Sequence, residues 1–362
     1  MTQPMTSKLL ALSLLLTPAL AHTTGAQAAV QAVAQGTASA NLNSVKTYLT
    51  GRLGVQAAGT AQLVKGADAY YALAKATGFD YKKLSANKGA VQAALKVARD
   101  GWTRASPVYE EVEGIVAGVE RLSAFDLILD AGTSAAEGGS DVAPFDLKLP
   151  SGKVLPRPGN LFGVNEGTLW NTVRSFSSGV AFDVDGDGKL GFGDSLPDAN
   201  VLKAAAAELN RQTGELQKAA SAWQPTRQDV FGALVGNVPT VGPVFFENWK
   251  TSRFVLGSRT TRTDFVVISR LSDLNGNVAS WEAMYRGLSP EIKGKNAALD
   301  AQITAGLNSL NSYVARLASQ EKTRRFTPEQ ADTLQAEAQN RATAITGRIT
   351  QAAALLGVKV SE

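Results

Sequence analysis

The sequence has no cysteine and only one histidine, His22, among its 362 residues. Without cysteine the chain can carry no lipid anchor on a cysteine, no disulfide and no reactive thiolate. His22 lies in or directly after an N-terminal segment that we expect to be removed. The folded body therefore lacks the histidine that a Ser-His-Asp triad, a Cys-His pair or a His-rich zinc site requires.

Long hydrophobic runs are also lacking. Lys8 precedes an apolar stretch at residues 9–20, which is shorter than the roughly 20 residues that span a bilayer. Small-x-small sequences end at Ala21 and at Ala28, and cleavage fits either position. We therefore predict a cleaved signal peptide within residues 1–28, then a flexible leader at 29–40. The protein is expected in the periplasm or at the cell surface, without a transmembrane span.

The sequence has little excess of charge of either sign. Residues 1–28 contain one lysine and no acid, so their removal leaves 35 basic residues against 32 acidic ones, a net charge of +3. Dense runs of lysine and arginine interleaved with aromatic residues, which are typical of nucleic-acid-binding proteins, do not occur. Nucleic acid is therefore not an expected partner.

Apolar residues recur at spacings of three, four and seven through most of the chain, which is typical of amphipathic helices. Pro107 is expected to end one helix or to begin the next. The helices predicted in the N-terminal half cover residues 45–84 as a helical hairpin, 87–105, 108–129, 165–175 and 199–223.

Residues 132–163 are rich in Gly, Pro, Ser and Asp, and a long irregular connection of this kind is usually functional or an insertion.

The C-terminal half contains two helix-start sequences. Ser289-Pro290-Glu291 and Thr327-Pro328-Glu329 each place a capping residue before a proline at the first helical position and an acid at the second. The apolar stripes nearby predict two long antiparallel helices. A Gly/Pro/Val stretch separates the halves. The expected fold class is all-α, with two packed helical bundles at residues 41–231 and 244–362.

Residues 183–194 match the twelve-residue calcium loop of an EF-hand position by position. The residues that would ligate Ca²⁺, at positions one, three, five, seven (through the backbone carbonyl) and twelve, are Asp183, Asp185, Asp187, Lys189 and Asp194. Gly188 permits the sharp turn at position six, and Leu190 is expected to pin the loop to a core. Carboxylates packed so closely repel one another strongly unless a divalent cation lies between them.

Two features distinguish this loop from a regulatory EF-hand. Asp194 has a shorter side chain than the glutamate usual at position twelve, and Pro197 delays the helix expected to follow. We therefore predict a structural calcium clip that joins two helices. The alternative is a solvated acidic turn.

Several runs of sequence resemble the imelysin-like family. They are FENWKTSRF at residues 246–254, SRLSDL at 269–274 and QAAALLGV at 351–358, and residues 102–132 add to the resemblance. That family includes the periplasmic component of a bacterial ferrous-iron uptake system and was first labelled a peptidase family. The resemblance implies a pair of helical bundles packed into one body, with a metal-binding role.

The site that the resemblance implies is a GxHxxE motif, whose His and Glu share a metal with acids from neighbouring helices. Its counterpart here is LFGVNE at residues 161–166, which keeps only Glu166 and has Gly163 at the histidine position. The missing imidazole is the ligand with the strongest preference for transition metals. Peptidase activity is accordingly not expected.

Carboxylates are the remaining candidate ligands for the family-type site. The predicted core helix carries acids at helical spacing, and Asp126 and Asp130 lie one turn apart in it. If Glu166 faces this helix, a site for Fe³⁺, Ca²⁺ or Mg²⁺ with oxygen ligands alone can form. The candidate ligands are Glu110, Glu113, Asp126 and Glu166. The alternative is that these acids solvate a polar helix face or pair with Arg104 and Arg121.

Two functions fit the sequence. The first is an exported imelysin-like binding protein that holds a metal ion or metal chelate, takes part in iron acquisition and is stabilised by calcium. The alternative is a calcium-clipped envelope protein that has lost the metal site. It would bind a cell-surface macromolecule through the irregular segment and through Trp170, Trp223 and Trp249. An enzyme is not expected, because a water activated by acids alone needs a general base and only Glu166 is placed as one.

Overall fold

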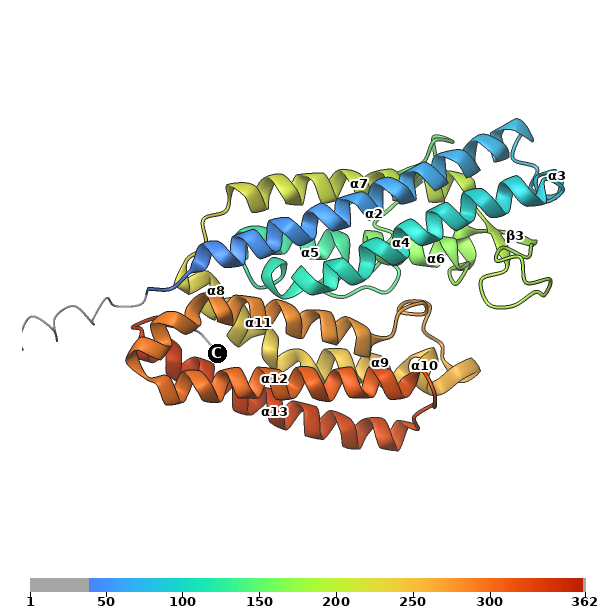
Figure 1. Cartoon of the computed structure of the whole chain (residues 1–362). Coiled ribbons are helices and arrows are strands. Elements are labelled where there is room, and N and C mark those ends of the chain that lie inside the picture. Colours follow the sequence, from blue (N-terminus) through green and yellow to red (C-terminus); the bar gives the residue numbers. More distant parts are fainter. Residues whose placement is uncertain (1–38, 361–362) are drawn as a thin grey trace, which may run out of the picture. The chain divides into compact units, whose positions relative to one another are not determined.

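The computed structural model describes residues 39–360 and is mainly helical (Figure 1). The predicted signal peptide and most of the predicted leader lie outside the described residues. The expected all-α fold class is confirmed, because the strands of the described part form only two short antiparallel pairs. From Ser39 onwards the chain packs as one compact unit, and its division into bundles at residues 41–231 and 244–362 stays a prediction.

The helices of this unit lie in two layers (Figure 1). The first layer contains α2 (Leu42–Ala76), α3 (Tyr81–Leu84), α4 (Lys88–Val116), α5 (Glu120–Leu129), α6 (Leu161–Leu169) and α7 (Ala199–Ala222). The second contains α8 (Arg227–Asn237), α9 (Glu247–Thr251), α10 (Arg253–Leu256), α11 (Arg270–Lys295), α12 (Ala297–Glu321) and α13 (Pro328–Leu355). Because α4 packs against both α2 and α11, it lies where the two layers meet.

Short turns and strands connect these helices. The helical turns are η1 (Arg174–Phe176), η2 (Val238–Val241), η3 (Gly242–Phe246) and η4 (Gly257–Arg259). The strand pairs are β1 (Leu147–Lys148) with β2 (Val154–Leu155), and β3 (Ser177–Ala181) with β4 (Ser195–Pro197).

Residues 45–84 do not form the predicted helical hairpin, because α2 runs unbroken and only the short α3 follows it. One glycine of α2, Gly66, serves a close helix contact. A Cβ atom on Gly66 would overlap the backbone nitrogen of Ala98 in α4, and one on Gly101 of α4 would overlap the backbone nitrogen of Leu63. Glycine at both positions therefore lets the backbones of α2 and α4 approach closely.

Two prolines of the described residues lie inside α-helices. α4 continues through Pro107 and α11 through Pro290, so the helix boundaries predicted at both positions are wrong. Proline removes one backbone hydrogen bond, and the buried residues that flank each proline keep the helix packed. The start predicted at Thr327 is confirmed, because Thr327 and Gln330 form a reciprocal capping box with Pro328 as the first helical residue.

The core helix predicted at residues 108–129 is broken into the end of α4 and the whole of α5. α4 ends at Val116, and the extended backbone of Val119 starts α5 in a new direction. Gly118 lies in this break, where a Cβ atom would overlap Ala233 of α8. The chain therefore changes direction at the point where it packs closely against the second layer.

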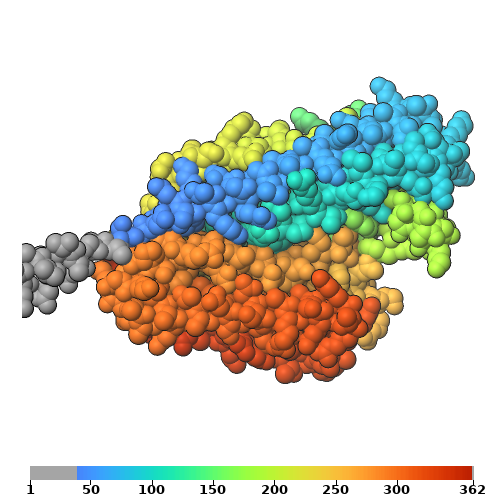
Figure 2. All heavy atoms as spheres, viewed as in Figure 1, coloured from blue at the N-terminus to red at the C-terminus, as the bar shows by residue number. Residues whose placement is uncertain are grey.

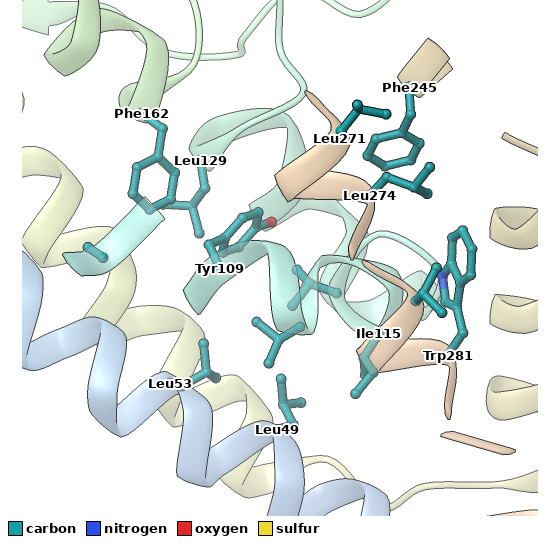
Figure 3. Packing of buried hydrophobic residues seen from close by; sticks show 14 of the residues in the cluster. Leu49, Leu53, Tyr109, Ile115, Leu129, Phe162, Phe245, Leu271, Leu274 and Trp281 are labelled. Atoms are coloured by element: carbon teal, nitrogen blue, oxygen red, sulfur yellow. The ribbon is translucent and has the colours of Figure 1, made fainter. Parts of the chain in front are cut away.

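Apolar side chains from both layers meet around α4 (Figure 3). Leu49 and Leu53 of α2 approach α4 from one side, and Trp281 of α11 lies on the other side. Tyr109 of α4 is fully buried among them, with its ring centroid 5.5 Å from that of Phe162. A buried tyrosine hydroxyl needs a hydrogen-bond partner, and this requirement brings an acidic side chain into the core.

One helical stretch of the described residues, Arg227–Thr251, is long and apolar enough to cross a membrane by length and composition. It comprises α8, η2, η3 and α9, and 56% of its most apolar window is buried inside the protein. A core helix of a soluble protein passes the same test. The predicted lack of a transmembrane span therefore stays a prediction.

Candidate metal centre

Three acidic side chains converge inside the protein where α4 and the end of α5 meet. Glu110 and Glu113 lie one turn apart on α4, and Asp130 is the C-cap residue of α5. One carboxylate oxygen of each lies within 4.8 Å of the other two. Glu110 and Asp130 are buried and Glu113 is partly buried, whereas Arg104 and Arg121 are exposed. The three acids therefore do not solvate a polar helix face.

α11 brings a cation and an amide to these carboxylates. Arg270 Nη1 lies 2.9 Å from Asp273 Oδ2 and 3.6 Å from Glu110 Oε1. Asn277 Nδ2 donates hydrogen bonds to Glu110 Oε2, at 3.0 Å, and to Glu113 Oε2. The acids of the first layer thus have a buried arginine of the second layer as their counter-ion.

Sequence reasoning noted Asp130 beside Asp126 but did not choose it as a ligand. It did not name Arg270, Asp273 or Asn277 as partners. Two signals were present, because Asp130 lies one turn after Asp126, and the SRLSDL run contains both Arg270 and Asp273. No signal in the sequence pointed to Asn277.

Asp126, which was predicted as a ligand, has a different partner. The Tyr109 hydroxyl donates a hydrogen bond of 2.7 Å to Asp126 Oδ1. Burial, followed by the negative charge of Glu113, raises the pKa of Asp126 to about 8. Asp126 lies next to the converging group, but it is not one of the three acids whose oxygens meet.

α6 places the counterpart of the GxHxxE motif beside the same acids. The helix begins at Leu161 instead of near residue 165, because Asn160 Oδ1 accepts a 2.7 Å hydrogen bond from the Gly163 N–H and caps the first turn. A cavity of about 30 Å³ lies here, and Gly163 lines it. The acids that line this cavity are Glu110, Asp130, Glu166, Asp264 and Asp273.

Glu166 is buried at the edge of this cavity and is held by backbone groups. Its Oε1 atom accepts hydrogen bonds from the N–H groups of Val266, at 3.0 Å, and Val267, at 2.9 Å. Burial raises the pKa of Glu166 to about 8 although both of these hydrogen bonds lower it. The predicted ligand Glu166 thus shares a cavity with Glu110 but lies outside the group of three converging carboxylates.

Burial and mutual repulsion favour protons on this group of acids. Burial, then the charge of Asp273, raises the pKa of Glu110, and burial, then the charge of Glu113, raises that of Asp130. The pKa of Asp273 rises to about 6 because burial outweighs the attraction of Arg270. One arginine cannot neutralise all of these carboxylates when they are ionised. Protons or a metal cation can balance the negative charge that remains on them. Oxygen ligands alone suit hard cations.

A larger cavity of about 610 Å³ borders the same residues. Glu113, Asp130 and Arg270 line it, and its other walls come largely from the irregular segment at residues 132–163 and from residues 262–265. A volume in this range is typical of small-molecule sites. The irregular segment is therefore part of the wall of the candidate metal centre.

The acidic loop brings three of its predicted calcium ligands together. Carboxylate oxygens of Asp183, Asp185 and Asp187 lie within 4.8 Å of one another. Asp183 accepts hydrogen bonds from the N–H groups of Gly186, at 2.7 Å, and Gly188, at 3.2 Å. Both glycines have positive φ angles, +83° and +82°, a conformation that glycine adopts without strain.

Three details differ from the predicted calcium clip. The loop joins β3 to β4 instead of two helices, and the following helix, α7, begins late, after Pro197, as predicted. Leu190, which was expected to pin the loop to a core, is 65% exposed. Asp194 Oδ1 and Oδ2 accept hydrogen bonds from the N–H groups of Val184, at 3.0 Å, and Gly191, at 2.8 Å, so its carboxylate is separate from the other three.

The tryptophans considered as surface contacts are mainly structural. Trp223 and Trp249 are buried in the core, and Trp249 Nε1 donates a hydrogen bond to Glu321. Trp170 is partly buried and packs edge-on against Trp102, with ring centroids 5.1 Å apart. Of the three, only Trp170 retains surface that a ligand can contact.

Comparison with known proteins identifies one family. The sequence model of the family described as Imelysin matches residues 53–349, which run from α2 to α13 and include both groups of acids. A search of curated proteins finds no match.

Proposed function

The chain belongs to the imelysin family, and on that basis we propose that it is an exported metal-binding protein of iron acquisition without peptidase activity. Fe³⁺ is the cation proposed for the buried carboxylates. The observation that carries this proposal is that oxygens of Glu110, Glu113 and Asp130 converge within 4.8 Å inside the protein.

The ligand chemistry supports a hard cation. The described residues contain neither histidine nor cysteine, so carboxylates, amides and water are the ligands that remain, and these suit cations that prefer oxygen. A purely structural ion-pair network would be expected to match charges, since unpaired buried charge is costly. Here Arg270 is the only basic side chain in an ion pair with the buried acids of residues 39–360.

We also propose that Ca²⁺ binds the acidic loop as a structural ion. The support is the group formed by Asp183, Asp185 and Asp187 together with the turn at Gly188, as in calcium loops. Export is proposed from the predicted signal peptide, and a periplasmic or cell-surface location would supply both cations.

Metal content and thermal stability test the iron proposal. Purified protein is freed of metal on a chelating resin and then supplied with Fe³⁺ as a weak chelate, or with Ca²⁺. We expect retained iron and, at an excess of about 100-fold over Kd, about 3 kcal/mol of stabilisation. Asp130→Asn should lose both effects and keep the Ca²⁺ response. Glu120→Gln, an exposed change at the start of α5, is the matched control.

The same experiment separates the alternative function. Iron retained equally by the wild type and Asp130→Asn would contradict a site at the buried carboxylates. If the wild type retains no iron while Ca²⁺ stabilises it through the acidic loop, the alternative of a calcium-clipped envelope protein that binds a cell-surface macromolecule would replace the proposal.

A further inference from the structure

A second cleft lies between the acidic loop and the second layer, and its residue Val266 donates its backbone N–H to the buried Glu166. It consists of two adjoining open hollows of about 600 and 610 Å³. The residues common to both are Trp170, Phe192, Arg253, Val266 and Arg325. The acidic loop and α10 lie at the same end of the described unit (Figure 1), and the loop, in yellow-green, reaches the surface there (Figure 2). We call this region the basic cleft.

The basic cleft carries cations that form no ion pair within the described residues. Arg253 and Arg325 line both hollows, and Lys322 and Arg324 line one of them. None of these four side chains forms an ion pair within residues 39–360. The turn between α12 and α13 and the helix α10 therefore carry positive charges that have no acidic partner in an ion pair.

The two acids of the basic cleft already have hydrogen-bond donors. Both carboxylate oxygens of Asp194 accept backbone N–H groups of the acidic loop. Glu321 accepts the Trp249 indole N–H, and burial raises its pKa. The remaining cation of the lining, Arg262, is paired with Asp264. The acids of the lining thus leave Arg253 and Arg325 uncompensated.

Backbone carbonyl oxygens hold both arginine side chains in place. Arg325 Nη1 donates a 3.1 Å hydrogen bond to the Arg253 carbonyl oxygen, and it packs so closely on Gly257 that a Cβ atom there would overlap it. Arg253 Nη1 donates to the Val266 carbonyl oxygen at 3.2 Å, and its guanidinium lies 3.6 Å from the centroid of the Phe192 ring. Burial, then the charge of Arg325, lowers the pKa of Arg253.

We propose that the basic cleft binds a small molecule that carries two or more carboxylate or phosphate groups. Planar guanidinium groups bind these anions through paired hydrogen bonds, and an anion between Arg253 and Arg325 would relieve their repulsion. The volume is that of a small-molecule site. Trp170 and Phe192 supply aromatic surface to the organic part of the ligand. This inference does not use the buried carboxylates and is independent of the proposed function.

Calorimetric titration tests the proposal with citrate and inorganic pyrophosphate as probes and acetate as the singly charged comparison. The protein is first freed of metal on a chelating resin, and Asp130→Asn and Asp185→Ala are titrated in parallel to exclude binding through a metal. We expect at least one oligovalent anion to bind more tightly than acetate, with affinity that falls as salt is added. Binding of citrate would indicate a carboxylate ligand, and binding of pyrophosphate would indicate a phosphate ligand.

Variants assign the binding to the basic cleft. Arg253→Gln and Arg325→Gln should each weaken the binding about tenfold. Arg121→Gln, an exposed change on α5 outside the cleft, should leave it unchanged. If either cleft variant misfolds, the exposed Lys322→Gln replaces it with a smaller expected loss, of about twofold to fivefold. The proposal is overturned if the wild type binds no probe better than acetate, or if the folded cleft variants bind as Arg121→Gln does.

Discussion

Burial decides the charge state of single acidic residues in this protein. Glu166 accepts two backbone hydrogen bonds, which favour a carboxylate, and yet burial raises its pKa to about 8. Its folded-state pKa therefore lies well above the value of about 4 expected in the unfolded chain. Since the folded state binds the proton more tightly, stability falls as the pH rises from about 4 to about 8.

The variant Glu166→Gln should remove this pH dependence. Glutamine keeps an Oε1 acceptor for Val266 and Val267 and carries no charge, so the variant should match the metal-free wild type at pH 4. Near pH 8 we expect it to be more stable by about 3–4 kcal/mol. Urea unfolding at pH 4, 6 and 8 measures the difference, with the exposed Glu120→Gln as control. A constant difference across this range would mean that Glu166 stays ionised in the folded protein.

Lys88 is the residue that competes with calcium at the acidic loop. Its Nζ atom lies 2.9 Å from Asp183 Oδ2, at position one of the predicted calcium loop. Ca²⁺ must displace this ammonium group, so Lys88→Met should tighten Ca²⁺ binding about twofold to fivefold. Calcium titration of the metal-free protein measures the change. The control is Lys96→Met, because Lys96 pairs with Asp100 on the same helix. Unchanged or weaker binding would argue against Ca²⁺ at Asp183.

At the scale of elements, the contact between α2 and α4 depends on two glycines. Gly66 and Gly101 face each other's helix backbones with no room for a Cβ atom, whereas a Cβ atom on Gly54 of α2 would meet no other atom within 4 Å. Replacing glycine by alanine at these two positions of α2 is therefore expected to change the stability of the protein in opposite directions.

Gly66→Ala should destabilise the protein by about 2–3 kcal/mol, because overpacking forces α2 and α4 apart. Gly54→Ala should stabilise it by about 0.5–1 kcal/mol, because alanine is the better helix former and meets no obstacle. Denaturant unfolding of both variants gives the comparison. Equal stability of the two variants would contradict the close approach of α2 and α4.

At the scale of the whole described unit, buried charge joins the two layers. Glu110 and Asp130 belong to the first layer, and Arg270 and Asp273 to the second. Unfolding one layer alone would leave the charges of the other without their partners, which is costly. α4 would also lose its apolar contact with α11.

We therefore expect residues 39–360 to unfold in a single calorimetric transition. The van't Hoff and calorimetric enthalpies should agree, and Gly66→Ala in the first layer should shift the entire transition to lower temperature. Scanning calorimetry of the metal-free protein provides the measurement. Two resolved transitions, with only one of them moved by Gly66→Ala, would show instead that the bundles at residues 41–231 and 244–362 are separate domains.

The sequence predicted the structural features that depend on local chemistry. Apolar spacing indicated the helical fold class, the capping box at Thr327 marked a true helix start, and glycines with positive φ formed the turns of the acidic loop. It failed where packing outweighs local preference. Pro107 and Pro290 continue their helices because buried residues on either side hold them, and Gly66 of α2 serves a close contact with α4.

Residue types and their spacing along the chain by themselves determined the fold class and the family resemblance. They also determined which side chains can serve as ligands, because the body contains acids but neither histidine nor cysteine. Only the tertiary structure decided which acids meet. Glu113, Asp130 and Arg270 come from three helices, and their grouping depends on how α4 packs against α5 and α11. Likewise, Arg253 and Arg325 become neighbours only through the packing of the second layer. Distances between residues far apart in sequence are set by packing, which local spacing does not encode.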